Sequence, residues 1–342
     1  MQRRGFLATA GTATAAALAG CTGFQTRPAG QPAVLEDRPD RVYFPTHVEG
    51  MKPAGRGESG PYRFALFYSY PHRFWNVNGE AVSPTPIAEE DDVHLMASVW
   101  DAETEQVLPD TGLSLEITRD GDLVSQEVIY PMLSQPMGFH YGANFGLDGD
   151  GTYDVTVSVG GVTTRRSGDF DGRFADAAST TIPFEYSETE RDDIPFERTP
   201  DRAGSGDAVD PMEMSTPMGF APTRESLPGV LGEGASGDAR FLVGALDSPP
   251  AGIDGDGTYL YASARTPYNR MSIPAMGVEA STGSFAGELH ATLDPDLGYH
   301  YGATVDAVGD EIEVRPTLPP QTARHEGYET AFRSFDPVVM SP

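Results

Sequence analysis

Apolar and polar residues alternate with a period of two along many short stretches of the chain, and Gly, Pro and Asp separate these stretches. This pattern predicts β-strands at 64–70, 92–100, 113–118, 123–130, 152–159 and 180–186. Arg-Asp-Gly-Asp at 119–122 predicts a hairpin turn between two of them. Because charged helical stripes are missing, we expect an all-β fold, and the strand spacing indicates an immunoglobulin-like sandwich.

Two short segments recur in the second half of the chain. Phe-His-Tyr-Gly-Ala at 139–143 returns as Tyr-His-Tyr-Gly-Ala at 299–303, and Val-His-Leu-Met-Ala-Ser at 93–98 has a counterpart at 258–263. We therefore expect two immunoglobulin-like β-sandwich domains, formed by a diverged duplication. The first would span 41–187 and the second 240–342, joined by an acidic linker at 188–239 that is rich in Pro and Gly.

The first residues have the pattern of an export signal. Arg3 and Arg4 precede an apolar run that ends in Leu-Ala-Gly-Cys at Cys21, which resembles a twin-arginine lipoprotein signal spanning 1–21. Cys21, the sole cysteine, would then be the lipidation site, and 22–40 would form a flexible tether. These features predict an extracytoplasmic protein, lipid-anchored to the outer face of the cell membrane.

The formal net charge is −28, and Lys52 is the single lysine in the chain. Such self-repulsion destabilises a compact state unless concentrated salt screens it, so the composition is typical of an extreme halophile. Nucleic acid is excluded as a partner because no basic surface could meet its phosphates.

The first repeat concentrates nitrogen and sulfur ligands. On the strand at 92–100, alternation places His94 and Met96 together on the face opposite the valines. Met132 and His140 lie at the two ends of a turn rich in Pro and Gly, so both side chains could return to that strand. Imidazole with thioether favours copper, above all Cu(I), and tolerates Fe(II) or Zn(II). Simple packing or backbone hydrogen bonding by these residues is the alternative.

These motifs resemble the periplasmic iron-transport family typified by the Tp34 and P19 proteins, over roughly residues 42–186. The shared segments are Val-His-Leu-Met-Ala-Ser, then Pro-Met-Leu, then Gly-Phe-His-Tyr-Gly-Ala-Asn. The resemblance implies an immunoglobulin-like sandwich that commonly dimerises and binds iron or copper. It assigns His94, Met132 and His140 as ligands. Met96 stands where the family has a glutamate, and one extra residue separates Met132 from His140.

The family's remaining histidine has no clear match after His140 within the first repeat. We therefore expect the two halves to pack as an internal pseudo-dimer, with His300 or His325 completing or flanking the site. His47, Met51 and Met137 are further secondary metal candidates, whereas His72 has the pattern of a packed or capping histidine.

Enzyme signatures are missing from the sequence: there is no nucleophile elbow, His-Glu-x-x-His motif, P-loop or dinucleotide fingerprint. The sequence favours a binding protein, not an enzyme, which captures an iron or copper ion and passes it to a membrane permease. The competing hypothesis is a cell-surface structural or interaction module with no metal. It predicts that His94, Met96, Met132 and His140 are scattered in the fold.

Overall fold

The computed structural model describes residues 32–342, which form one compact unit. The twin-arginine segment, Cys21 and the beginning of the expected tether lie outside these residues. Within 32–342, no helix combines the length and apolar character that a membrane span requires. Residues 32–40, expected to belong to the tether, lie against the folded body, where Arg38 Nη1 is 3.3 Å from Glu329 Oε1.

The fold is all-β, as predicted, and its antiparallel sheets are consistent with β-sandwich domains. In the first half, one sheet has the order β2 (Lys52–Ser59), β3 (Tyr62–Ser69), β6 (Val93–Asp101), β10 (Gly138–Phe145), β9 (Tyr130–Ser134), β23 (Ala323–Arg324), β4 (Phe74–Asn78) and β5 (Ala81–Thr85). The facing sheet has the order β13 (Ala178–Tyr186), β11 (Gly151–Val159), β7 (Ser114–Arg119) and β8 (Asp122–Val128).

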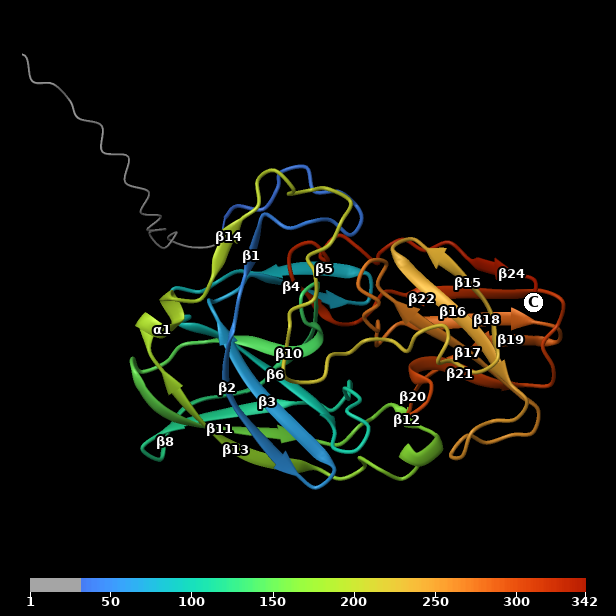
Figure 1. Ribbon diagram of the computed structural model, residues 1–342, viewed down its shortest axis with the longest axis horizontal. Coiled ribbons are helices and arrows are strands. Elements are labelled where there is room, and N and C mark those ends of the chain that lie inside the picture. The colour runs from blue at the N-terminus through green and yellow to red at the C-terminus, as the bar shows by residue number, and fades with distance from the viewer. Residues whose placement is uncertain (1–31) are drawn as a thin grey trace, which may run out of the picture. The chain divides into compact units, whose positions relative to one another are not determined.

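The second half repeats this arrangement with two further sheets. The larger has the order β12 (Arg165–Arg166), β20 (His290–Asp294), β21 (Gly298–Val305), β17 (Thr258–Arg265), β16 (Ala239–Leu246) and β15 (Val230–Ser236). The smaller has the order β19 (Phe285–Glu288), β18 (Gly277–Thr282), β22 (Ile312–Leu318) and β24 (Val338–Met340). Figure 1 shows the two groups of sheets side by side.

All six strands predicted from alternation occur, each within two residues of its expected ends. The predicted turn joins β7 to β8, with Asp120 and Gly121 both at positive φ, as a two-residue hairpin requires. Strand β11 shows why alternation works: Tyr153, Val155 and Val157 face the core, and the residues between them are exposed or half-buried. Strand β6 is instead buried along its whole length, because both of its faces are covered.

The range 188–239, expected as a linker, carries a short helix α1 (Glu188–Asp192) and strand β14 (Phe196–Arg198), which pairs with β1 (His47–Glu49). Strand β15 also begins inside this range, at Val230. Between them the chain lies against the β9–β10 hairpin. There the Val209 amide donates to Gln135 Oε1 at 2.7 Å and the Met212 amide to the Pro136 carbonyl at 2.9 Å. Such contacts satisfy its backbone groups and hold it in place.

Each half sends a two-residue strand into the main sheet of the other half. Strand β23 pairs in parallel with β9, placing Ala323 opposite Met132. Strand β12 pairs in parallel with β20, placing Arg165 opposite Thr292, and Figure 1 shows β12 beside the second group of sheets. The exchange brings the segment after β23, including His325, to the face of the first sheet that carries the candidate ligands.

Candidate metal centre

Three adjacent strands place the candidate ligands on one face of the large sheet. In the β6–β10 ladder His94 lies opposite Asn144, and in the β10–β9 ladder His140 lies opposite Met132. Directly opposed residues of an antiparallel pair point to the same face. Ser134 pairs with Gly138, which turns the chain between β9 and β10 at φ +67°.

His94, His140 and His325 converge on one point. One ring nitrogen from each residue forms a group whose members all lie within 4.8 Å of one another. His94 and His140 are fully buried, and His325 is half-buried. Three imidazoles at this separation can bind one transition-metal ion, since each needs to move only slightly to reach a bond length of about 2 Å.

Hydrogen bonds determine which ring nitrogen of His94 and of His140 faces the space between the three histidines. Nδ1 of His94 lies 2.8 Å from Asn144 Oδ1, and Nδ1 of His140 lies 3.1 Å from the Gly138 carbonyl oxygen. Because each oxygen accepts, both histidines carry the proton on Nδ1 and present the Nε2 lone pair to the centre. The Nε2 atoms of His94, His140 and His325 are buried with no hydrogen-bond partner in the described chain. Such orphaned acceptors are costly unless something binds them.

Electrostatics keeps these imidazoles neutral. Burial lowers the pKa of His140 to about 4. Burial and the nearby His72 hold the pKa of His94 well below its usual value, and the same causes act on His325. A neutral imidazole is the form that binds a metal ion, so the three nitrogens are ready to do so near neutral pH.

Met132 supplies a sulfur atom at the same place. A Cβ built on Gly142 would lie 2.7 Å from His94 Nε2 and 3.1 Å from Met132 Sδ, so both atoms border the space that this glycine leaves open. Met132 is fully buried. The candidate set is therefore three imidazole nitrogens and one thioether sulfur.

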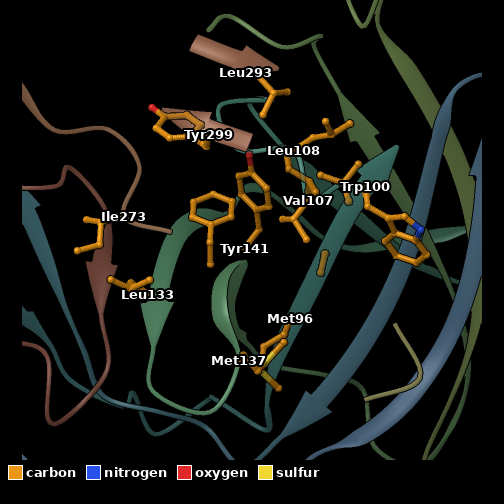
Figure 2. Close-up of a cluster of buried hydrophobic side chains, with 14 of the residues drawn as sticks. Met96, Trp100, Val107, Leu108, Leu133, Met137, Tyr141, Ile273, Leu293 and Tyr299 are labelled. Carbon is orange, nitrogen blue, oxygen red and sulfur yellow. The ribbon is translucent and has the colours of Figure 1, made fainter. Parts of the chain in front are cut away.

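Met96 and Met137 lie in the apolar core. Figure 2 shows their side chains next to each other, away from Tyr141 and Leu133 in the same cluster. Both also line a cavity that reaches His325. Met96 is on the same face of β6 as His94, as alternation predicted, and its environment is mainly apolar.

The secondary candidates divide into two groups. His47 and Met51 line the cavity beside the triad. His300 belongs instead to the second half, where its Nε2 lies 2.9 Å from the Tyr259 hydroxyl and its Nδ1 lies 3.0 Å from the Gly298 carbonyl oxygen.

Sequence reasoning undervalued His72 and overlooked Glu49. The His72 ring stacks on His94 with ring centroids 4.4 Å apart, and its Nδ1 lies 2.8 Å from Glu49 Oε1. Burial alone would raise the pKa of Glu49, but His72 and His47 together lower it to about 2. The His-x-Glu spacing at 47–49 is the one local signal that could have pointed to this carboxylate.

Comparisons with known proteins match parts of the chain. A family described as a domain of unknown function, DUF7350, matches residues 225–341. The chain is structurally similar to FetP of uropathogenic E. coli strain F11, as isolated, with 22% identity and a TM-score of 0.32 over 40% of this chain and 96% of that one. A copper-bound variant of FetP gives 22% identity and a TM-score of 0.32 over 40% and 97%. No curated protein matches the chain.

Proposed function

We propose that this protein is an extracytoplasmic, membrane-anchored carrier that captures a transition-metal ion, iron or copper, for uptake or handling. The observation that carries the proposal is the convergence of His94, His140 and His325 with their Nε2 atoms buried and without hydrogen-bond partners in the described chain. A carrier must hold its ion and release it unchanged, and this donor set offers ligands and no reacting group.

The chemistry of the donors favours copper. Three imidazoles and the Met132 thioether form a soft to borderline set that suits Cu(I), while Fe(II) and Zn(II) are accepted less selectively. The Met132 sulfur borders the same space as His94 Nε2. Export through the twin-arginine signal and anchoring at Cys21 would hold the carrier outside the membrane, where a permease could receive the ion.

We further propose that the two halves derive from a duplication. The first half retained its metal site, and side chains of the protein itself occupy the corresponding pocket of the second half. Three register pairs of the first half have equivalents in the second. The pair His94–Asn144 corresponds to Tyr259–Thr304, the pair Met96–Gly142 corresponds to Tyr261–Gly302, and the pair Met132–His140 corresponds to Thr292–His300.

The second pocket is closed by the protein's own groups. Tyr259 hydrogen-bonds His300, and Arg165, arriving on β12, donates to Thr292 Oγ1 at 3.0 Å and to the Gly302 carbonyl at 2.7 Å. In the first half the equivalent arm, β23, brings His325 instead. We therefore propose that the second half completes the metal site of the first sandwich by supplying His325 from the arm that follows β23.

Metal analysis by mass spectrometry tests the proposed function. The protein from residue 22 onward is purified in concentrated salt, exposed separately to Fe(II), Cu(I), Cu(II) and Zn(II), and compared with a His94→Ala/His140→Ala variant. A His290→Ala variant is the matched control, since this side chain is 51% exposed and lies on another strand. We expect stoichiometric metal in the wild type and control, and none in the double variant. Metal-free wild-type protein under every condition would favour a surface interaction module.

A further inference from the structure

His325 differs from the other two histidines of the triad in what orients its ring. Asn144 and the Gly138 carbonyl hold the rings of His94 and His140 through Nδ1. No hydrogen bond within the described chain reaches the ring of His325. The backbone of the loop that follows β23 therefore determines where the third nitrogen lies.

The His325 loop, residues 325–330, lies against the N-terminal strap, residues 32–46. Hydrogen bonds join the two segments along their length: from the Tyr43 amide to the Gly327 carbonyl at 3.2 Å, from the Thr46 amide to Glu326 Oε1 at 2.8 Å, and from the Thr330 hydroxyl to the Pro39 carbonyl at 2.7 Å. The strap includes residues 32–40, which the sequence predicted as part of a flexible tether. Its contacts with the loop give this stretch a structural role.

A buried carboxyl group makes the closest side-chain link between the strap and the loop. The Tyr43 hydroxyl donates to Glu329 Oε1 at 2.5 Å, and Arg38 Nη1 lies 3.3 Å from the same oxygen. Glu329 Oε2 accepts the Gly327 amide at 2.7 Å. Tyr43 is fully buried and Glu329 is 2% exposed. A carboxyl group at this depth is costly without such partners, so the strap stabilises Glu329 where it lies.

The fit between the two segments requires a glycine at position 327. Gly327 has φ +92°, and a Cβ there would lie 2.6 Å from the Tyr43 carbonyl oxygen. The Gln135 side-chain amide donates to the Tyr43 carbonyl at 2.8 Å and to the Gly327 carbonyl at 3.2 Å. Gln135 belongs to the turn between β9 and β10, the strands that carry Met132 and His140. The strap, the loop and this hairpin therefore meet at one place.

We propose that the N-terminal strap positions His325 for the metal centre, and that Tyr43 and Glu329 are its positioning residues. Neither side chain belongs to the donor set, and both act by fixing the loop that begins with the third ligand. The proposal rests on the proposed function for the role of His325 as a ligand, whereas the contact between strap and loop can be measured without metal. His94 and His140 lie on strands outside this contact, so loosening the strap should weaken metal binding without abolishing it.

Hydrogen–deuterium exchange of the metal-free protein tests the contact between the strap and the His325 loop. The variant is Tyr43→Phe/Glu329→Gln, which removes a hydroxyl group and a carboxylate with little change in volume. We expect the amides of residues 325–330 to exchange about tenfold faster or more, because the loop then opens at lower cost. Unchanged exchange of this loop in the variant would overturn the proposal.

Tyr62→Phe/Asp101→Asn is the matched control for both experiments. The Tyr62 hydroxyl donates to the Asp176 carbonyl at 3.2 Å, and Asp101 Oδ1 lies 2.6 Å from Arg173 Nη2. Both residues are buried, and they lie at the other end of the β3–β6 ladder from His94. The control therefore removes a buried tyrosine hydroxyl and a buried carboxylate far from the strap, and it should leave loop exchange and Cu(I) affinity unchanged.

Cu(I) affinity in a double-mutant cycle tests whether the strap acts through His325. Competition with a chromophoric chelator compares the wild type, Tyr43→Phe/Glu329→Gln, His325→Ala and the combined variant. We expect the strap variant to bind one Cu(I) about tenfold more weakly or weaker still, and to cause no further loss once His325 is alanine. An equal loss with and without His325 would contradict positioning, since it would reflect a general effect on the fold.

The two experiments distinguish this proposal from the proposed function. Absence of Cu(I) from the wild type would count against the carrier, and exchange would still decide whether the strap holds the loop. If circular dichroism shows that the double replacement does not fold, Tyr43→Phe alone carries both predictions, because Glu329 then keeps its contacts with Arg38 and Gly327.

Discussion

At the scale of single residues, two acceptor oxygens determine the chemistry of the centre. Asn144 Oδ1 and the Gly138 carbonyl each take the Nδ1 proton of a histidine, so Nε2 of His94 and His140 is left as a base. Asn144 is itself fixed, because its Nδ2 donates to the His72 carbonyl at 2.8 Å. Fixed acceptors set both the tautomer and the ring orientation before any ion arrives.

The lowered pKa values give the apoprotein and the metal complex a characteristic pH dependence. Folding moves the pKa of His140 from 6.5 to about 4, so the folded state binds fewer protons than the unfolded chain between these values. The resulting contribution to stability is present above the unfolded pKa and is lost as the pH falls toward the folded one.

We therefore predict that protons displace the metal ion only when the pH falls to the folded-state pKa of His140 or below it, because the bound ion competes with the proton. Protein loaded at about pH 7 and dialysed at successively lower pH should keep its ion to about pH 5 and release it as the pH approaches about 4. Metal content after each dialysis step is the measurement. Release with a midpoint near 6.5, the ordinary histidine value, would mean that the ligands are not the buried imidazoles.

Two buried methionines on the same sheet face provide a matched pair for testing the sulfur ligand. Met132→Leu should lower the affinity for Cu(I) by about tenfold or more, because the soft donor is lost while the volume is nearly kept. Met96→Leu should leave it unchanged, since Met96 packs in the apolar core beside Met137. Competition with a chromophoric Cu(I) chelator measures both. The opposite order would assign the sulfur ligand to Met96.

Residue patterns in the sequence indicated part of the site for a physical reason. His94 shares its sheet face with Met96 because strand periodicity is local, and the Pro/Gly-rich turn showed that Met132 and His140 could lie together. Glu49 carried only the His-x-Glu spacing at 47–49, and Glu326 carried no local signal. They meet through His47 across the fold, and no local period encodes such a contact.

At the scale of elements, the parallel pairing of β23 with β9 brings the third histidine to the centre. Backbone bonds fix the arm, since the His325 amide donates to the Leu133 carbonyl at 3.3 Å. Its counterpart after β12 is Ser167, whose amide donates to the Leu293 carbonyl at 3.0 Å. Equivalent main-chain bonds thus present different side chains, a histidine in one half and a serine in the other.

The β9–β10 hairpin also contacts the second half, and this contact can be tested by stability. A Cβ at Gly138 would lie 2.8 Å from Met271 Sδ, whereas a Cβ at Gly60 would meet nothing within 4 Å. Both glycines have positive φ, +67° and +56°.

Gly60→Ala should lower the free energy of unfolding by about 1 kcal/mol from backbone strain alone. Gly138→Ala should lower it by about 1–3 kcal/mol more, because the added methyl group overpacks against Met271. Denaturant unfolding at fixed salt measures both values. Equal losses would indicate that the hairpin and the Met271 segment do not touch in solution.

Strands β11 and β2 show what the sequence pattern could and could not predict. Strand β11 alternates cleanly because one face packs on the core and the other meets solvent. Strand β2, Lys-Pro-Ala-Gly-Arg-Gly-Glu-Ser at 52–59, lacks β-branched residues and was not predicted. It lies at the edge of its sheet, where Pro and Gly are tolerated and no apolar alternation is needed.

At the scale of the whole molecule, the strong negative charge favours the approach of cations, including the metal ion that we propose the protein binds. A net charge of −28 attracts cations to the surface, and Glu49 and Glu326 are among the residues that line the cavity beside the triad. The requirement for concentrated salt remains a prediction from this charge.

The position of His325 could not have been computed from local pattern, because the residue lies 185 positions after His140 in a short arm of the other half. Only the repeat indicated that the second half supplies the histidine that the first half lacks. The exchange of the short strands β12 and β23 between the two halves depends on how the sandwiches pack. The alternation of apolar and polar residues along the sequence carries no information about that packing.

A crystal structure of the Cu(I)-loaded protein, with anomalous scattering recorded at the copper edge, is the most direct test of the metal centre. We predict an anomalous peak bonded to Nε2 of His94, His140 and His325 at about 2.0–2.1 Å and to Met132 Sδ at a somewhat longer distance of about 2.3 Å. A peak elsewhere in the protein, or no peak in crystals of protein shown to hold copper in solution, would contradict this assignment.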